Sequence, residues 1–386
     1  MTSRLPTWLD PRTAYVHVPF CGHHCGYCDF AVTAGNDHLI ELYLDALAME
    51  LATLGEPRPV ESLFIGGGTP TYLSADALRR LLTTIREWLP IVPGSVAEFS
   101  IESTPDSLDA EKIAVMAAFG VNRLSIGVQS FHTHVLQSLE RQHSVERIAR
   151  AVEIVRPQIP ALSFDLIFGA PGQTVPEWEA DLNTALAFAP DHLSTYGLTY
   201  EKGTPLWKQR ERGQVREVGE DLELQMYQAA IANLSGAGFE HYEVSNFAKP
   251  GQRCRHNERY WANDAYYGFG VGAARYVNGS RDLNIRDTKM YIRKVLAGES
   301  PTFQTEMLDV RERAFETLAI QLRRIQGIVR DDFQLRTGYD IDALIGEPLR
   351  HFADEGLLQL SATDIRLTPR GTYVADGIVT SLMKSA

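Results

Sequence analysis

Several sequence features that indicate a protein's class and cellular location are scarce in this chain. Only 4 of its 386 residues are cysteines, and its start lacks the apolar core of a secretory signal, so we do not expect a disulfide-stapled secreted protein. No stretch approaches the roughly 18 apolar residues that span a bilayer, which predicts no integral membrane segment. No internal repeat or low-complexity tract is present. These absences favour a globular protein of the reducing cytoplasm.

Positive charge is scarce as well. Lys and Arg number 37 against 49 Asp and Glu, which gives a formal net charge of −12. Proteins that bind nucleic acid tightly present a basic field to phosphate, so we expect no nucleic-acid partner. The length suffices for one large α/β domain and one small domain. The apolar fraction of 44% is ordinary for a globular protein.

What the chain does have is a cysteine triplet. Cys21, Cys25 and Cys28 lie within eight residues, directly after a short apolar run that predicts a strand. One loop with three thiolates at this spacing would hold three irons of a cubane cluster. Because iron–sulfur clusters ordinarily have four cysteine ligands, the fourth iron would be open. An open iron indicates chemistry or ligand exchange rather than a sealed structural site.

Two other interpretations of the triplet exist. With His23 or His24 the three thiols would form a Cys₃His zinc site, although zinc loops usually contain two separated cysteine pairs. A disulfide is disfavoured because the chain has so few cysteines. The fourth, Cys254, lies far along the chain, and we interpret it as a free thiol or a group near the site rather than as a cluster ligand.

Strands and helices are expected to alternate through the first part of the chain. Candidate strands lie at residues 14–19, 62–65, 98–101, 123–128, 162–168 and 192–198. Stretches that predict helices lie at residues 39–54, 75–89, 110–119, 145–155, 175–188 and 219–234. Such alternation favours βαβ units with right-handed crossovers and a parallel sheet. Six units are too few for a closed eightfold barrel, so we predict an α/β fold with an open, partial (β/α)₆ TIM-like barrel.

Polar and glycine-rich segments follow the predicted strands. The glycine run 66–71 follows the second strand, Glu102 ends the third and Gln129 ends the fourth. Asp165 lies in the fifth, shortly before the turn-forming segment 169–174. In barrels of this type the site lies at the carboxyl ends of the strands. We therefore expect these segments to meet the cysteine loop at one mouth.

The rest of the chain departs from this pattern. Residues 242–276 are rich in aromatic and polar side chains, and a helix is predicted at 287–297. From about residue 306 we expect three helices, a hairpin with strands at 357–360 and 365–367, and a last helix, which together resemble a winged-helix module. Its charge does not favour DNA, so we interpret it as a packing or docking module. The predicted parts are a barrel at 1–240, an aromatic-rich connecting region at 241–305 and a C-terminal helical, winged-helix-like domain at 306–386.

The cysteine motif, Cys-x₃-Cys-x₂-Cys with Tyr27 before its last cysteine, resembles the radical S-adenosylmethionine (SAM) superfamily. There the amino and carboxylate groups of SAM chelate the open iron. Further segments resemble the HemN-like branch, the oxygen-independent coproporphyrinogen oxidases; they are residues 17–21, 66–71, 127–130, 141–143 and 165–174. The resemblance implies a [4Fe–4S] cluster on Cys21, Cys25 and Cys28.

The resemblance also implies a SAM pocket beside the cluster. Its expected residues are Tyr15, Tyr27, Gly67, Gly68, Thr69, Glu102, Gln129, Arg141 and Asp165. Glycines let backbone groups approach a ligand closely, which suits the amino end of SAM. Glu102 would accept hydrogen bonds from the amino group or the ribose. Gln129, Arg141 and Asp165 match family positions that contact nucleoside or carboxylate groups. The resemblance assigns no catalytic residue.

Two departures separate the chain from the oxidases. The oxidases carry a further cysteine where this chain has Phe30, and a long arm where this chain has little sequence before its first predicted strand. Both favour the sister family of heme chaperones (HemW). Residues 254–261, Cys-Arg-His-Asn-Glu-Arg-Tyr-Trp, resemble the His-Asn-x-x-Tyr-Trp signature of that family. Taken alone, a histidine among aromatics favours a hydrogen-bonded structural role. With the signature, heme contact becomes an equal alternative, and the residues expected at heme are His256, Asn257, Tyr260 and Trp261.

We therefore expect a cytoplasmic heme chaperone that binds a [4Fe–4S] cluster, SAM and heme and passes heme to an acceptor protein. The sequence identifies neither the acceptor nor whether SAM is cleaved. The alternatives are an oxygen-independent coproporphyrinogen III dehydrogenase and a HemN-like methyltransferase or cyclopropanase that uses two SAM molecules. Phe30 and the short N-terminal arm disfavour the first, and the signature at 256–261 disfavours the second.

Overall fold

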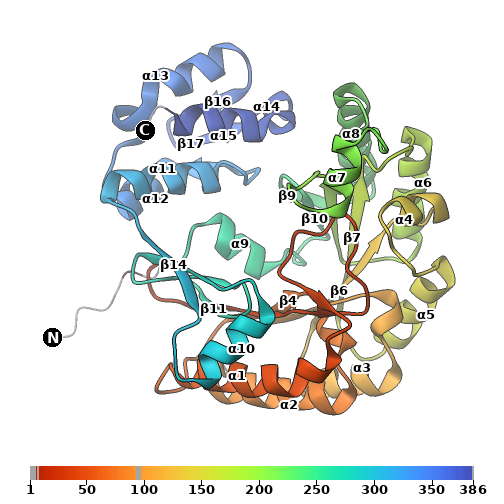
Figure 1. Ribbon diagram of the computed structural model, residues 1–386. Coiled ribbons are helices and arrows are strands. Elements are labelled where there is room, and N and C mark those ends of the chain that lie inside the picture. Colours follow the sequence, from red (N-terminus) through yellow and green to blue (C-terminus); the bar gives the residue numbers. More distant parts are fainter. Residues whose placement is uncertain (1–5, 7, 93–96, 385–386) are drawn as a thin grey trace.

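The computed structural model describes residue 6 and residues 8–92 and 97–384. Six parallel strands form the centre of its largest sheet, and each coincides with a predicted strand. They are β1 (Thr13–Val18), β4 (Ser62–Gly67), β5 (Glu98–Ser103), β6 (Arg123–Gln129), β7 (Ala161–Phe168) and β8 (His192–Gly197). They alternate with helices around a partial barrel (Figure 1). The predicted (β/α)₆ architecture is confirmed.

Three further strands extend this sheet at its edges. β11 (Tyr267–Gly270) lies parallel beside β1, with Phe269 opposite Val16. β10 (Asn246–Ala248) lies antiparallel beside β8, and β9 (Glu240–Glu243) pairs with β10. The order across the sheet is β11-β1-β4-β5-β6-β7-β8-β10-β9. Sequence analysis did not predict these three short strands.

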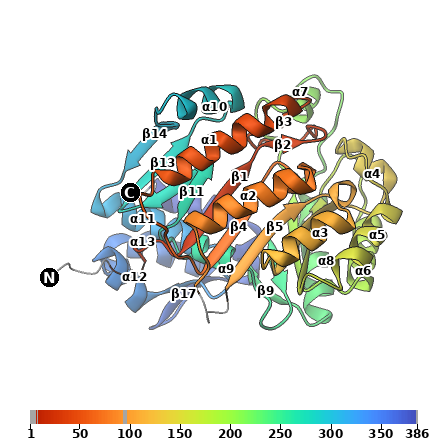
Figure 2. The same cartoon turned by 90° about the horizontal axis from the view of Figure 1, so that it is seen from below.

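Helices cover one face of the sheet, and α1, α2 and α3 lie side by side on it (Figure 2). The helices that were predicted are α1 (Ile40–Ala52), α2 (Ala75–Trp88), α3 (Ala110–Ala118), α5 (Val145–Val155), α6 (Val175–Ala187) and α8 (Glu220–Gly236). Their apolar sides are buried, as Leu78 and Leu82 of α2 show. Within the predicted barrel region, residues 1–240, two short helices of the described chain were not expected, α4 (Thr133–Ser138) and α7 (Pro205–Glu211).

The remaining strands before the C-terminal region form two small sheets. β2 (Phe20–Cys21) pairs with β3 (Thr33–Ala34). The second sheet is antiparallel and consists of β12 (Ala274–Val277), β13 (Ser280–Asn284) and β14 (Thr302–Met307). Helix α10 (Thr288–Leu296) lies between β13 and β14 in the chain, where a helix was predicted.

The C-terminal helices form a module with its own hydrophobic core, in the upper left of Figure 1. Its elements are α11 (Val310–Gln321), β15 (Ile328–Val329), α12 (Arg330–Thr337), α13 (Ile341–Asp354), β16 (Leu358–Leu360), β17 (Asp364–Leu367), α14 (Pro369–Tyr373) and α15 (Ala375–Met383). The predicted hairpin is present as β16 and β17, and β15 adds a third strand beside β17. The expected boundaries at 240 and 305 stay predictions.

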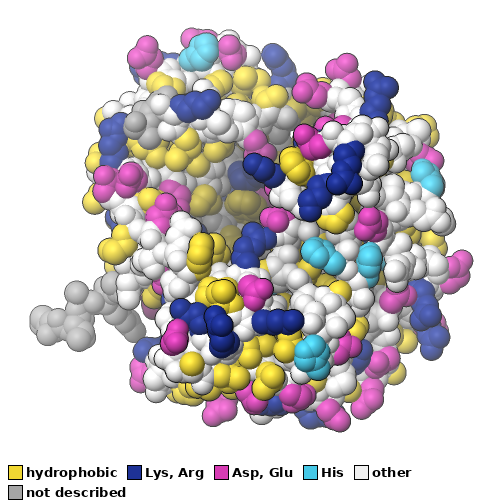
Figure 3. All heavy atoms as spheres, in the orientation of Figure 1, with side chains coloured by type: hydrophobic (Ala, Val, Ile, Leu, Met, Phe, Trp, Pro, Cys, Tyr) yellow, Lys and Arg dark blue, Asp and Glu magenta, His cyan; other side chains and the backbone are white. Residues whose placement is uncertain are grey.

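The space-filling view shows the surface hollowed between the C-terminal module and the barrel (Figure 3). Within the described part of the chain, no helix combines the length and the apolar character that crossing a membrane requires.

Helix α9 (Arg255–Trp261) is anchored at the base of the barrel, where the central strands begin. Glu98, the first residue of β5, accepts hydrogen bonds from the N–H groups of Arg255 at 2.9 Å and His256 at 3.2 Å. The Cys254 thiol donates to the same carboxylate at 3.2 Å, and Arg123 pairs with it at 3.2 Å. Because a negative charge is favourable at the start of a helix, Glu98 fixes the position of α9.

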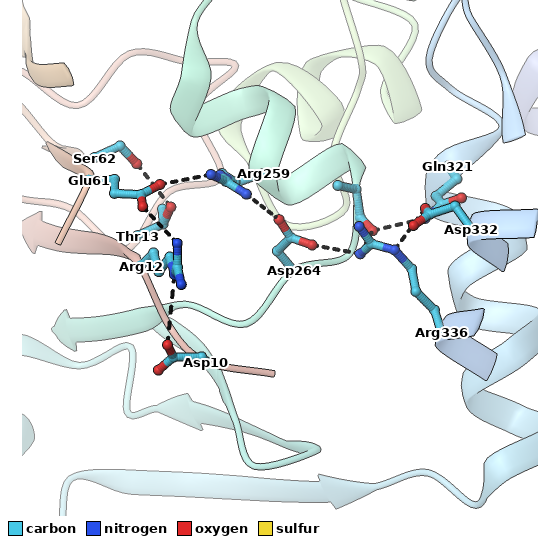
Figure 4. A network of polar contacts seen from close by, with 11 residues as sticks. Asp10, Arg12, Thr13, Glu61, Ser62, Arg259, Asp264, Gln321, Asp332 and Arg336 are labelled. Atoms are coloured by element: carbon cyan, nitrogen blue, oxygen red, sulfur yellow. Dashed lines mark hydrogen bonds and ion pairs between the residues drawn. The ribbon is translucent and has the colours of Figure 1, made fainter. Parts of the chain in front are cut away.

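Ion pairs join the base of the barrel to the C-terminal module (Figure 4). Arg259 of α9 contacts Glu61 at 2.8 Å and Asp264 at 3.0 Å. Asp264 also contacts Arg336 of α12 at 2.6 Å. Arg336 reaches Asp332 at 2.8 Å. The two parts of the chain are therefore linked by side chains that each have a charged partner.

A second buried carboxylate ties α1 to the β11 edge of the sheet. Glu50 is 3% exposed and accepts hydrogen bonds from the Gly270 N–H at 2.8 Å, the Asn284 amide at 2.7 Å and the Tyr291 hydroxyl at 2.5 Å. Burial raises the pKa of Glu50. Buried donors from β11, β13 and α10, all distant from α1 in sequence, thus share this one acceptor.

Replacing Glu50 with Leu should leave three buried donors without an acceptor. We expect the free energy of unfolding, measured by urea denaturation, to fall by about 3 kcal/mol. The matched control is Glu153→Leu on the exposed side of α5, which should change stability by less than about 0.5 kcal/mol. Equal effects of the two substitutions would show that Glu50 does not hold these segments together.

Candidate functional site

The cysteine loop starts at the carboxyl end of β1 and is closed by a small parallel sheet. Cys21 of β2 lies opposite Ala34 of β3. Within the loop the Cys28 N–H donates to the Cys25 carbonyl at 3.1 Å, which forms a turn. The three predicted cluster ligands therefore share one closed loop at the mouth of the barrel.

The three thiols have different surroundings. Cys25 is 7% exposed, and its sulfur lies 3.6 Å from Arg141 Nη1. The Cys21 sulfur lies 3.6 Å from the Thr69 hydroxyl. Burial raises the pKa of the Cys21 thiol, and it raises that of Cys28 to about 11. Because burial opposes ionisation here, thiolates need a compensating cation such as the Arg141 guanidinium.

The donor set of this loop fits an iron–sulfur cluster. Metal ligation requires thiolates, and the loop offers three thiols, of which Cys25 lies beside the Arg141 guanidinium. Among the residues that the structure describes, no group of three or more His, Cys, Asp or Glu side chains lies close enough together to hold a metal ion. His24 instead contacts the Cys28 carbonyl at 3.1 Å, and His23 lies 3.8 Å from Glu140. Neither histidine is arranged with the thiols as the zinc alternative requires.

The glycine run after β4 is required by the packing of the protein itself. Gly67 has a φ of +106°, and a Cβ there would lie 2.3 Å from the His17 ring. A Cβ on Gly66 would lie 2.6 Å from Glu102, and one on Gly68 would lie 2.8 Å from the backbone after β1. Sequence analysis explained these glycines by close approach of a ligand. The structure supplies a different reason, which is close approach of neighbouring protein groups.

Two half-buried carboxylates interact near the glycine run. Glu102 accepts a hydrogen bond from the Gly67 N–H at 2.9 Å, and Asp165 accepts one from the Ser125 hydroxyl at 2.9 Å. Burial raises the pKa of Glu102 to about 7, and the negative charge of Asp165 adds to the effect. Burial also raises the pKa of Asp165. A cationic ligand would therefore be favoured beside these two acids.

Gln129 and Arg141 meet at a bulge between β6 and β7. Gln129 has a φ of +66°, which is uncommon for a residue other than glycine. A Cβ on Gly127 would lie 2.7 Å from Arg141 Nη2 and 3.0 Å from Gln129 Nε2, so this glycine makes room for both. Arg141 Nη2 donates to the Gly127 carbonyl at 3.2 Å, while its buried Nε has no partner among the described residues. Local strain beside an unpaired donor is typical of a functional site.

The Tyr15 side chain contacts His17, a histidine that sequence analysis did not assign to the site. The Tyr15 hydroxyl donates to His17 Nδ1 at 3.0 Å, and His17 Nε2 donates to the Ala31 carbonyl at 2.9 Å. Burial lowers the pKa of His17 to about 4, so its ring is neutral. His17 thus contacts the end of the cysteine loop. Its signals in the sequence were its place shortly before Cys21 and the family-like segment 17–21, which begins with it. Tyr27 packs in an apolar cluster with residues such as Val135.

The expected heme residues lie on different faces of α9. His256 is 2% exposed, and its ring stacks on Phe64 at 4.9 Å and meets Tyr260 edge-on at 4.6 Å between ring centres. Neither ring nitrogen of His256 has a hydrogen-bond partner in the described part of the chain. Trp261 instead lies under the Arg323 guanidinium of the C-terminal module, at 5.1 Å. The structure brings His256 and Tyr260 together and separates Trp261 from them.

The raised pKa of Glu102 predicts a pH-dependent cost to stability. Between about pH 4.5 and 7 the folded protein retains a proton that the unfolded chain releases, so stability falls as the pH rises. Glu102→Gln keeps an acceptor for Gly67 and removes this cost. Measured by denaturant titration without ligands, the stability of the variant relative to the unchanged protein should rise by on the order of 1–3 kcal/mol from pH 4.5 to 8. If the difference in unfolding free energy between the two proteins does not change with pH, Glu102 does not have a raised pKa in the folded protein.

Comparison with known proteins identifies the family. The Radical SAM superfamily matches residues 15–185, and the HemN C-terminal domain matches residues 308–374. The heme chaperone HemW of Bacillus subtilis (strain 168) is 35% identical over 373 residues, which cover 95% of this chain and 98% of that protein. The heme chaperone HemW of Escherichia coli (strain K12) is 32% identical over 358 residues, which cover 91% of each protein.

A solved structure shows the same fold. Coproporphyrinogen III oxidase (HemN) from Escherichia coli, a radical SAM enzyme, superimposes with a TM-score of 0.85 at 24% identity, covering 98% of this chain and 91% of that chain. The sequence relatives extend over nearly the whole chain, and the two family matches include the cysteine loop and most of the C-terminal module. The chain therefore belongs to the HemW family of the radical SAM superfamily.

Proposed function

We propose that the chain is a cytoplasmic heme chaperone that holds a [4Fe–4S] cluster, SAM and heme and passes heme to an acceptor protein. The observation that supports this most is that one chain combines a three-thiol loop at the barrel mouth with the 256–261 signature on α9. Relatives of this length and similarity are named heme chaperones. No residue is proposed as catalytic, and the acceptor is not identified.

The cluster is proposed to bind Cys21, Cys25 and Cys28. It would supply an iron with an open coordination position. Arg141, 3.6 Å from the Cys25 sulfur, would offset the negative charge of the thiolates. The Thr69 hydroxyl, 3.6 Å from Cys21, would donate to that sulfur once it is ionised. These contacts favour the ionised thiols that ligation requires.

SAM is proposed to bind beside the cluster, at the mouth of the barrel. Glu102 and Asp165 would accept hydrogen bonds from its positively charged groups, which would relieve the cost of burying two acids. The unpaired Nε of Arg141 would donate to a carboxylate. The complete proposed set is Tyr15, Tyr27, Gly67, Gly68, Thr69, Glu102, Gln129, Arg141 and Asp165. Of these, Tyr15 is proposed to act mainly by orienting His17.

Heme is proposed to contact His256, Asn257, Tyr260 and Trp261. Burial lowers the pKa of His256 to about 4, so the imidazole is in the neutral form that binds iron. His256 faces the inside of the barrel and Asn257 is half-buried. Ligation by His256 would therefore require α9 to move away from Phe64, whereas Trp261 needs no such movement.

The rival function is that of an oxygen-independent coproporphyrinogen III dehydrogenase. The HemN structure shares the fold with this chain, but the fold alone does not transfer the reaction. Phe30, which stands where the oxidases carry a further cysteine, is 64% exposed beside the cluster loop. The methyltransferase or cyclopropanase alternative has less support, because relatives named HemW match nearly the whole chain.

Each of Cys21→Ser, Cys25→Ser and Cys28→Ser should remove most of the iron and sulfide that anaerobic reconstitution introduces. The matched control is Cys254→Ser, because this free thiol is buried at the base of the barrel against Glu98. The control should keep the iron content of the unchanged protein. If all four variants retain iron and sulfide, the triplet does not hold the cluster.

The reconstituted protein should bind heme but should form no protoporphyrinogen from coproporphyrinogen III when SAM and a reductant are supplied. Heme binding is followed by absorbance, and turnover by product analysis, with Escherichia coli HemN as the positive control. Turnover would assign the chain to the oxidases. Absence of both binding and turnover would contradict the chaperone proposal.

A further inference from the structure

A cleft of about 470 Å³ lies between α9, the base of the barrel and the C-terminal module. Its wall includes Tyr242, Arg255, Trp261, Arg324 and Arg336. The backbones of Glu243 and Arg324 form an antiparallel bridge, which joins β9 to the segment after α11 and fixes one side of the cleft. This volume is typical of a site for a small organic ligand.

The cleft and the barrel interior are on opposite sides of α9. Trp261 follows His256 by five residues, which places the two side chains about 140° apart around a helix of 3.6 residues per turn. His256 packs on Phe64 in the barrel, and Trp261 lines the cleft. A single flat ligand therefore cannot contact both side chains while α9 keeps this position.

Most arginines of the cleft already have acidic partners. Arg259 is paired with Glu61 and Asp264, and Arg336 is paired with Asp264. Arg324 differs, because within the described ranges it has no ion pair and its buried Nη2 has no hydrogen-bond partner. Burial and the neighbouring Arg336 guanidinium lower the pKa of Arg324, whereas nearby carboxylates, among them Asp264, raise it. Among the described residues, Arg324 thus offers an N–H donor without an acceptor in the cleft that Trp261 also lines.

We propose that this cleft binds a carboxylate side chain of heme through Arg324, with Trp261 against the porphyrin ring; the inference rests on the proposed heme-chaperone function. Heme carries two carboxylate side chains on a flat apolar ring. A guanidinium binds a carboxylate through two parallel hydrogen bonds, and the indole would cover apolar ring surface. Arg255 lines the same cleft and is the candidate for the second carboxylate.

The test compares heme with its dimethyl ester, in which both carboxylates are blocked. Each compound is titrated into the unchanged protein, Arg324→Met and Arg255→Met in the same detergent-containing buffer. Loss of a charged hydrogen bond should weaken heme binding about tenfold in Arg324→Met. The ester should bind the unchanged protein and Arg324→Met with equal affinity. Arg150→Met on the exposed side of α5 is the control and should bind heme normally.

Three outcomes separate the hypotheses. If Arg324→Met binds heme more weakly but binds the ester unchanged, the cleft is supported as the heme site. If the Arg324 variant does not fold, the same pattern in Arg255→Met supports it. Unchanged heme affinity in both variants, while the unchanged protein binds heme, overturns the cleft but not the chaperone function. If the unchanged protein binds no heme, the proposed function fails and this inference fails with it.

Discussion

The arrangement of the molecule depends on one buried carboxylate at the base of the barrel. Glu98 is 5% exposed, accepts hydrogen bonds from two backbone N–H groups at the start of α9 and from the Cys254 thiol, and pairs with Arg123. Without it, the two N–H groups and the thiol would lose this acceptor and the Arg123 guanidinium would lose its carboxylate partner, which costs several kcal/mol. Because Glu98 fixes α9, it also determines that His256 faces the barrel interior and Trp261 the C-terminal module.

At the other end of the barrel, burial sets the electrostatics of the mouth. It raises the pKa of Glu102 and of the Cys28 thiol, so both groups are costly in the charged form. Arg141 supplies one cation beside Cys25, but its Nε has no partner among the residues that the structure describes. A metal cluster together with a ligand that carries both amino and carboxylate groups would satisfy the thiols, the acids and this donor at once. Bound charged ligands would therefore lower the free-energy cost of keeping these groups charged at the mouth.

The barrel could be predicted because its signals are local, whereas much of the site depends on tertiary packing. Strands such as β1 and β4 are marked by short apolar runs, and parallel strands bring residues such as Glu102 to one edge. β10 and β11 have three and four residues, and only their pairing with β8 and β1 makes them strands. Likewise, the need for glycine at position 67 comes from the ring of His17, which no spacing in the sequence reveals.

The two faces of α9 would link the proposed heme binding to the position of the C-terminal module. Arg323 lies over Trp261, and Arg336 is held by Asp264 in the loop after α9. The module therefore docks through the same short segment that carries the heme signature. A ligand that engages Arg324 beside Trp261 would contact both sides of this junction, so it would bind the docked arrangement more tightly than an undocked one. By linkage, ligand binding and docking would then stabilise each other.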